Sequence, residues 1–74
     1  MNNSKFAVCL SNQDYPASLE PRKLYEIVDD PQATSKGMLR VIDESGEDYL
    51  YSASMFAQMP ISAALADTLH KLAA

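Results

Sequence analysis

The sequence predicts a mainly β domain, a small and partly open barrel of five strands, followed by a short C-terminal α-helix. Two β-favouring runs on either side of Ser45 and Gly46 indicate a central hairpin. Other short β-favouring runs separated by turn-forming residues fill the chain up to residue 59. After Pro60 the apolar residues change to helical spacing. With 74 residues the chain makes a single domain, residues 1–74.

Proline and turn-forming residues set the limits of the expected strands. Pro16 and Pro21 lie in a segment without periodicity, residues 12–23, which we expect to be a long loop after the first strand. Pro31 ends the second strand because it lacks the amide that a ladder would use. The expected strands are residues 5–10, 24–28, 38–44, 47–53 and 54–59, with Phe56 as a core residue of the last one.

The C-terminal segment, residues 61–73, is predicted to be a helix. Ser62 can cap its start. Its apolar stripe consists of Ile61, Leu65, Leu69 and Leu72. A helix of about three turns is marginal alone in water. We therefore expect the stripe to pack on the barrel or on another chain.

The hairpin can take two registers, which differ in the face that its tyrosines occupy. A two-residue loop at Ser45 and Gly46 pairs Arg40 with Tyr51 and places Tyr49 on the same face as both. A bulge at Gly46 instead shifts the pairing by one residue and puts both tyrosines on the inner face. In the simplest interpretation, at least one of the two tyrosines is a core residue with its hydroxyl at the rim.

Charge and cysteine content exclude several classes of partner and compartment. The net charge is −4 and only six residues are basic, so we expect no binding to nucleic acid or to anionic membranes. Cys9 is the single cysteine, so no intramolecular disulfide can form, and we expect it to have a structural role. Only five apolar residues, 6–10, follow the N-terminal residues, too few for a signal-peptide core. We expect a cytoplasmic protein.

The segments 24–30 and 37–51, together with Phe56, resemble an uncharacterised bacterial family of small Src-homology-3-like (SH3-like) barrel proteins. The resemblance covers roughly residues 5–59 and implies a five-stranded SH3-like barrel. It places residues 12–23 where eukaryotic members carry the long first loop that helps form a peptide groove. It does not imply their proline-rich ligand, because the chain has no tryptophan for the aromatic wall and Tyr15 is the only aromatic residue in this loop.

No catalytic or ligand-holding group can be assembled from the sequence. Cys9 and His70 are each the only residue of their kind, which leaves no base for a nucleophile and no four-ligand zinc set. Four acids crowd the hairpin tip without the spacing of a calcium loop, and we interpret them as a solvated, charged turn: Asp43, Glu44, Glu47 and Asp48. We expect no enzyme activity, no metal and no cofactor.

We therefore expect a non-catalytic protein-interaction module. Aromatic and guanidinium groups bind proteins well because they bury large areas at low entropic cost. The candidate partner-binding residues are Tyr15, Arg40, Tyr49, Tyr51, Leu65 and Leu69. The alternatives are a structural or regulatory homodimer that packs its leucine stripe across a two-fold axis, and an accessory subunit of a larger complex.

Overall fold

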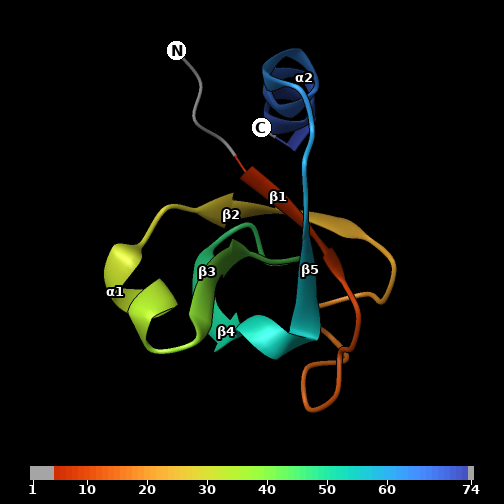
Figure 1. Cartoon of the computed structure of the whole chain (residues 1–74). Coiled ribbons are helices and arrows are strands. Elements are labelled where there is room, and N and C mark those ends of the chain that lie inside the picture. The colour runs from red at the N-terminus through yellow and green to blue at the C-terminus, as the bar shows by residue number, and fades with distance from the viewer. Residues whose placement is uncertain (1–4, 74) are drawn as a thin grey trace.

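The computed structural model describes residues 5–73, without the side chain of the last of these. Figure 1 shows a small sheet, a short helix beside it and a longer helix at one end. The strands are β1 Lys5–Cys9, β2 Leu24–Val28, β3 Met38–Ile42, β4 Asp48–Ser52 and β5 Phe56–Met59. The helices are α1 Pro31–Ser35 and α2 Ala63–Ala73, and a 3₁₀ turn, Ala53–Met55, precedes β5.

The five strands form one antiparallel sheet in the order β4-β3-β2-β1-β5. This confirms the expected mainly β fold with a C-terminal helix. The sheet is not closed, because β4 and β5 are its two edges and the described residues show no pairing between them.

The core lies on one face of this sheet. Tyr25 and Ile27 of β2 point to it, as do Leu39 and Val41 of β3, with the two-residue period of a half-buried strand. The remaining buried members are Ala7, Cys9, Leu19, Tyr51 and Phe56. Phe56 is thus the core residue that the sequence predicted, and Cys9 is fully buried.

The β3–β4 hairpin has the bulged register. The Gly46 amide donates to the Asp43 carbonyl at 2.9 Å, and the Asp43 amide donates to the Glu47 carbonyl at 3.2 Å. Gly46 has a φ of 84°, the left-handed conformation that closes a three-residue loop with a bulge. Tyr51 therefore lies opposite Leu39, and the two-residue loop that would pair it with Arg40 is wrong.

A short helix, α1, occupies the linker between β2 and β3, for which the sequence predicts no helix. Its signals are nonetheless local, since Asp30 accepts from the Ala33 amide at 3.1 Å and Pro31 stands in the first turn. Ala33 is buried. The helix is one turn long and ends at Ser35; Lys36 is its C-cap, and Gly37, whose φ is 73°, follows.

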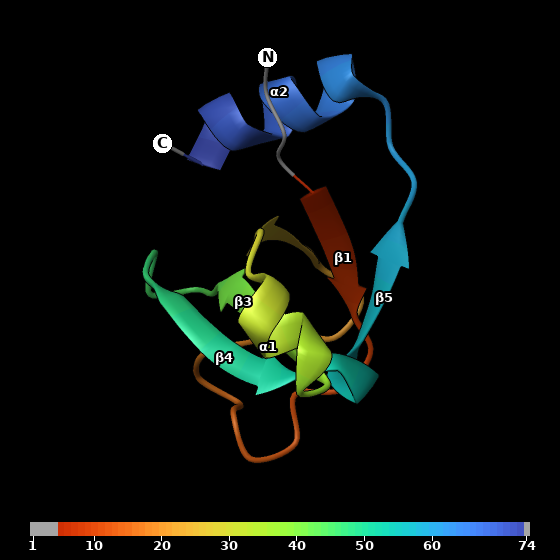
Figure 2. The ribbon, with the colours of Figure 1, turned by 60° about the vertical axis from the view of Figure 1, so that its left-hand side comes forward.

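Helix α2 lies across the end of the sheet where β1 begins and β5 ends (Figure 2). Ser62 caps it as predicted, because its hydroxyl accepts from the Leu65 amide at 3.1 Å. Ala66 is buried and Leu69 half-buried, whereas Leu65 and Leu72 are 46% and 77% exposed. The expected leucine stripe is therefore only partly covered by this chain.

Candidate functional site

Three tyrosines from distant parts of the chain meet on one side of the sheet. Tyr15 comes from the β1–β2 loop, and Tyr49 and Tyr51 come from β4. The ring centre of Tyr15 lies 4.8 Å from that of Tyr51 and 6.3 Å from that of Tyr49, both in edge-to-face arrangements. The two β4 rings are 5.2 Å apart. We call these three residues the tyrosine cluster.

The β1–β2 loop is held in place from within, which positions Tyr15. Leu19 is fully buried in the core although it lies in the loop. The amides of Ser18 and Leu19 both donate to the Tyr15 carbonyl at 3.1 Å, and the Ser18 carbonyl accepts from the Glu44 amide at 3.0 Å. The loop is therefore anchored to the core and to the hairpin tip, so Tyr15 is presented on a fixed backbone.

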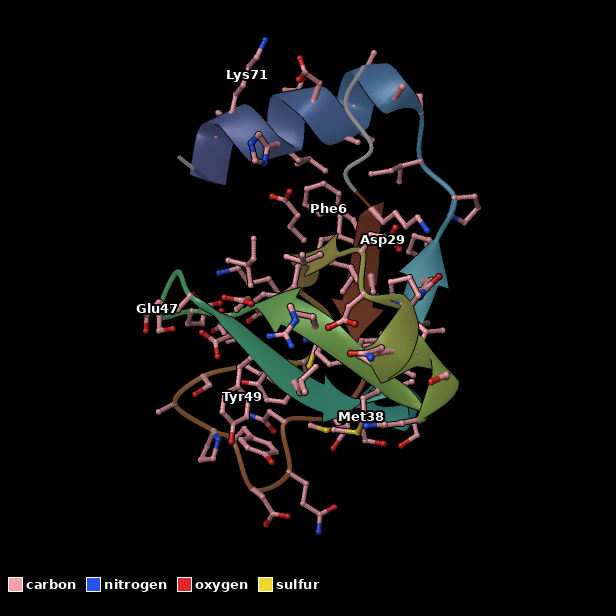
Figure 3. The ribbon with its side chains drawn as sticks, turned by 90° about the vertical axis from the view of Figure 1, so that its left-hand side faces the viewer. Phe6, Asp29, Met38, Glu47, Tyr49 and Lys71 are labelled. Carbon is pink, nitrogen blue, oxygen red and sulfur yellow. The ribbon has the colours of Figure 1, made fainter. Side chains whose placement is uncertain are left out.

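The three side chains of the tyrosine cluster differ in their exposure to solvent. Tyr51 is 1% exposed, Tyr15 is half-buried and Tyr49 is 54% exposed. Figure 3 shows Tyr49 on the side of the molecule away from Lys71 and α2. Tyr51 thus acts as a buried support, and Tyr15 and Tyr49 form the accessible aromatic surface. This confirms the interpretation that at least one of the two hairpin tyrosines belongs to the core.

Asp43 accepts a hydrogen bond from the hydroxyl of the buried Tyr51. The Tyr51 hydroxyl donates to Asp43 Oδ2 at 2.7 Å, and the Ser45 amide donates to Oδ1 at 2.9 Å. Partial burial acts to raise the pKa of Asp43, but the hydrogen bonds from Ser45 and Tyr51 outweigh it and hold that pKa below its usual value. Burial, and then the Asp43 carboxylate, raise the pKa of Tyr51 to about 12.

A second tyrosine ties the loop to the hairpin in the same way. The Tyr25 hydroxyl accepts from the Glu20 amide at 2.8 Å and donates to Glu44 Oε2 at 2.6 Å. Lys23 pairs with the same carboxylate, and these contacts from Lys23 and Tyr25 lower the pKa of Glu44. The prediction that the tip acids form only a solvated turn is therefore wrong for Asp43 and Glu44, which are structural acceptors.

Arg40 lies on the opposite face of the sheet from the tyrosine cluster. Its Nε is 2.9 Å from Asp30 Oδ2, and its Nη1 is 2.9 Å from Asp48 Oδ2. Asp30 also caps α1, and the pKa of its carboxyl is lowered by the Ala33 amide and by Arg40. The guanidinium thus links the start of α1 to the edge strand β4.

Leu65 and Leu69 lie on α2, at the other end of the molecule from the tyrosine cluster (Figure 3). A groove of about 510 Å³ runs between this helix and the sheet, with Phe6, Leu69 and Leu72 among its lining residues. The helix is tied down by His70, whose Nδ1 lies 2.8 Å from Glu26 Oε1. The six candidate residues therefore divide among three separate places.

Residues 5–73 show no cluster of three or more His, Cys, Asp or Glu side chains that could hold a metal ion. Burial raises the pKa of the Cys9 thiol, which lies 3.3 Å from the Ser11 carbonyl. In the same part of the chain, neither helix is long and apolar enough to cross a membrane. Comparisons of the chain with protein families, curated proteins and solved structures found no match.

Proposed function

We propose that this protein is a small non-catalytic interaction module with an SH3-like barrel organisation, and that it binds a protein partner through the exposed part of the tyrosine cluster. The observation that carries the proposal is Tyr49, a large aromatic side chain left 54% exposed although two other tyrosine rings hold it in place. Five antiparallel strands and a long first loop support the SH3-like organisation.

A supported aromatic surface favours protein binding for a physical reason. The ring of Tyr49 loses little conformational freedom when a partner covers it, because Tyr15 and Tyr51 already restrict it. Tyrosines with one apolar face and one polar group are enriched among residues that dominate binding energies.

The charges beside the cluster indicate the chemistry of the partner. Exposed acidic residues lie close to both accessible tyrosines in the sequence. Asp14 directly precedes Tyr15, and Glu47 lies two residues before Tyr49. Cations are attracted both to carboxylates and to the faces of aromatic rings. We therefore propose a partner segment that combines apolar side chains with arginine or lysine.

Site-specific photo-crosslinking tests this proposal. A photoreactive phenylalanine analogue replaces Tyr49 in the full chain, and a second version carries it in place of Lys71, whose side chain is 73% exposed on α2. The expected result is a discrete covalent adduct with one protein from position 49 and none from position 71 in the cells that encode the chain. Equal labelling from both positions, or none from position 49, contradicts the proposal.

A variant pair checks that the tyrosine itself contributes affinity. Tyr49→Ala should abolish retention of the crosslinked partner on the immobilised protein, while Leu65→Ala, a truncation of similar exposure on α2, should leave retention unchanged. Circular dichroism establishes that both variants remain folded. Undiminished retention by Tyr49→Ala would remove the tyrosine cluster from the binding surface.

A further inference from the structure

Among the described residues, the edge strand β4 pairs with β3 alone, so one side of its backbone is open to another strand. Ala53 donates to the Gly37 carbonyl at 2.9 Å and Asp43 donates to the Glu47 carbonyl at 3.2 Å, so the bonded pairs of the hairpin are known at both ends. Bonded and non-bonded pairs alternate in an antiparallel ladder. The pairs Val41–Tyr49 and Leu39–Tyr51 lie two and four residues from the bonded pair Asp43–Glu47, so both are bonded pairs. The amides and carbonyls that point away from the sheet are therefore those of Asp48, Leu50 and Ser52.

The usual protection of an edge strand is weak here. Natural edge strands avoid pairing through lysines, prolines, bulges or unpaired charges. β4 contains no lysine or proline, and its one charged residue, Asp48, is paired with Arg40 at 2.9 Å. Leu50 and Tyr49, which point to opposite faces of this strand, are 37% and 54% exposed. An added strand would thus meet apolar surface on both faces and no uncompensated charge.

We propose that β4 pairs with β4 of a second copy of this chain, antiparallel and across a two-fold axis at Leu50. This inference is independent of the partner proposed above. In this register Asp48 lies opposite Ser52 of the second copy, whose hydroxyl can donate to a carboxylate. All three outward-pointing residues of each strand take part, which gives about six backbone hydrogen bonds.

Other registers of the same strand are less complementary. An axis at Asp48 places two carboxylates opposite each other, which destabilises a strand pair. An axis at Ser52 shifts the pairing into the 3₁₀ turn Ala53–Met55, where the backbone is not extended. The Leu50 register also places Tyr49 beside Tyr51 of the second copy, so it joins the two tyrosine clusters into one continuous surface.

The oligomeric state in solution tests the dimer and its site. Pairing of two short edge strands covers less area than a standard stable interface, so a weak, concentration-dependent dimer is expected. Sedimentation equilibrium of the full chain from micromolar to millimolar concentrations should show this dimer. Leu50→Lys should weaken it at least tenfold because two lysines would meet on the axis. Gln58→Lys introduces a lysine at an outward-pointing position of the opposite edge strand β5 and should leave the dimer unchanged.

A cysteine at the axis provides a second measurement that does not depend on the lysine variant. Paired residues at a bonded position have Cα atoms about 5.5 Å apart, within the range of roughly 4.4–6.8 Å that a disulfide spans. Leu50→Cys should therefore oxidise to a covalent dimer much faster than Gln58→Cys, and the native Cys9 is buried. A chain that stays monomeric to millimolar concentration, a dimer that resists Leu50→Lys, or equal oxidation rates at the two edges would each overturn the proposal. If Leu65→Lys abolishes the dimer while Leu50→Lys leaves it intact, the dimer interface lies on α2. This result would also overturn the proposal.

Discussion

Replacing Tyr51 by phenylalanine isolates the contribution of one hydroxyl to the fold. The ring of Tyr51 is 1% exposed, and phenylalanine retains its packing against Tyr15. The variant loses the hydrogen bonds of this hydroxyl, of which the one to the Asp43 carboxylate is 2.7 Å long and another involves the Ser18 side chain. A hydrogen bond to a charged group contributes about 1.5–3 kcal/mol. We expect Tyr51→Phe to lower the free energy of unfolding by about 2 kcal/mol, a large part of the roughly 3–5 kcal/mol that a core of this size supplies.

Urea and thermal unfolding followed by circular dichroism measure this change. A loss of about 2 kcal/mol corresponds to a fall in Tm of roughly 8–16 °C for a domain of this size. Tyr49→Phe is the matched control, because Tyr49 is 54% exposed, and this variant should stay within about 0.5 kcal/mol of the unchanged protein. If the two variants unfold alike, the Tyr51–Asp43 hydrogen bond does not stabilise the fold as we argue.

The pH dependence of the same variant gives an independent check. Since the pKa of Asp43 is depressed in the folded state, its contribution is present above an unfolded pKa of about 3.9 and is lost as the pH falls through the folded value. Since the pKa of Tyr51 is raised from 10.0 to about 12, its contribution is present below pH 10 and is lost as the pH rises towards 12. The stability difference between the unchanged protein and Tyr51→Phe should therefore be constant between these limits and shrink beyond either.

Three further substitutions test the loop, the turn and the helix. Leu19→Ala removes a fully buried side chain and should cost about 2–5 kcal/mol, whereas Leu10→Ala, at a position 58% exposed, should change the unfolding free energy by less than about 0.5 kcal/mol in urea titrations. Gly46→Ala should cost about 1–2 kcal/mol in the same assay through its φ of 84° alone, because an added Cβ meets nothing within 4 Å. His70→Ala removes the contact with Glu26, so amide hydrogen exchange in α2 should accelerate while exchange in the central strands stays unchanged.

The sequence predicts the elements whose signals are local. The strands were placed within about two residues by their β-favouring runs, and Ser62 was correctly assigned as the cap of α2. The register of the hairpin could not be decided in the same way, because Ser45 and Gly46 fit both a two-residue turn and a three-residue loop with a bulge. The choice depends on the core, since only the bulged register puts Tyr51 on the face that holds Leu39 and Val41.

Long-range contacts account for what the sequence did not predict. Leu19 lies between two prolines in a segment without periodicity, so nothing local marks it as a core residue, and only its apolar side chain in a polar loop hints at an anchor. Asp43 resembles its acidic neighbours in sequence, and its role comes from Tyr51, eight residues away on the facing strand. The helix α1 has two local signals in the sequence, the cap Asp30 and the N-terminal Pro31. However, one turn is too short to show a helical period of apolar residues.

Arg40 links the start of α1 to the edge strand β4. Its contact with Asp30 supports the cap of α1, and its contact with Asp48 compensates the only charge on β4. Removing the guanidinium, as in Arg40→Met, should therefore raise the pKa of Asp30 towards its usual value and also leave an uncompensated carboxylate on the edge strand. The sequence predicts Arg40 as a candidate contact for a partner, and this stays a prediction. The strand pairing proposed above gives Arg40 a second, indirect role, because its guanidinium neutralises Asp48 on the edge strand. If Arg40→Met self-associates more weakly but binds the protein partner as well as the unchanged protein does, Arg40 acts on strand pairing and not as a direct contact for that partner.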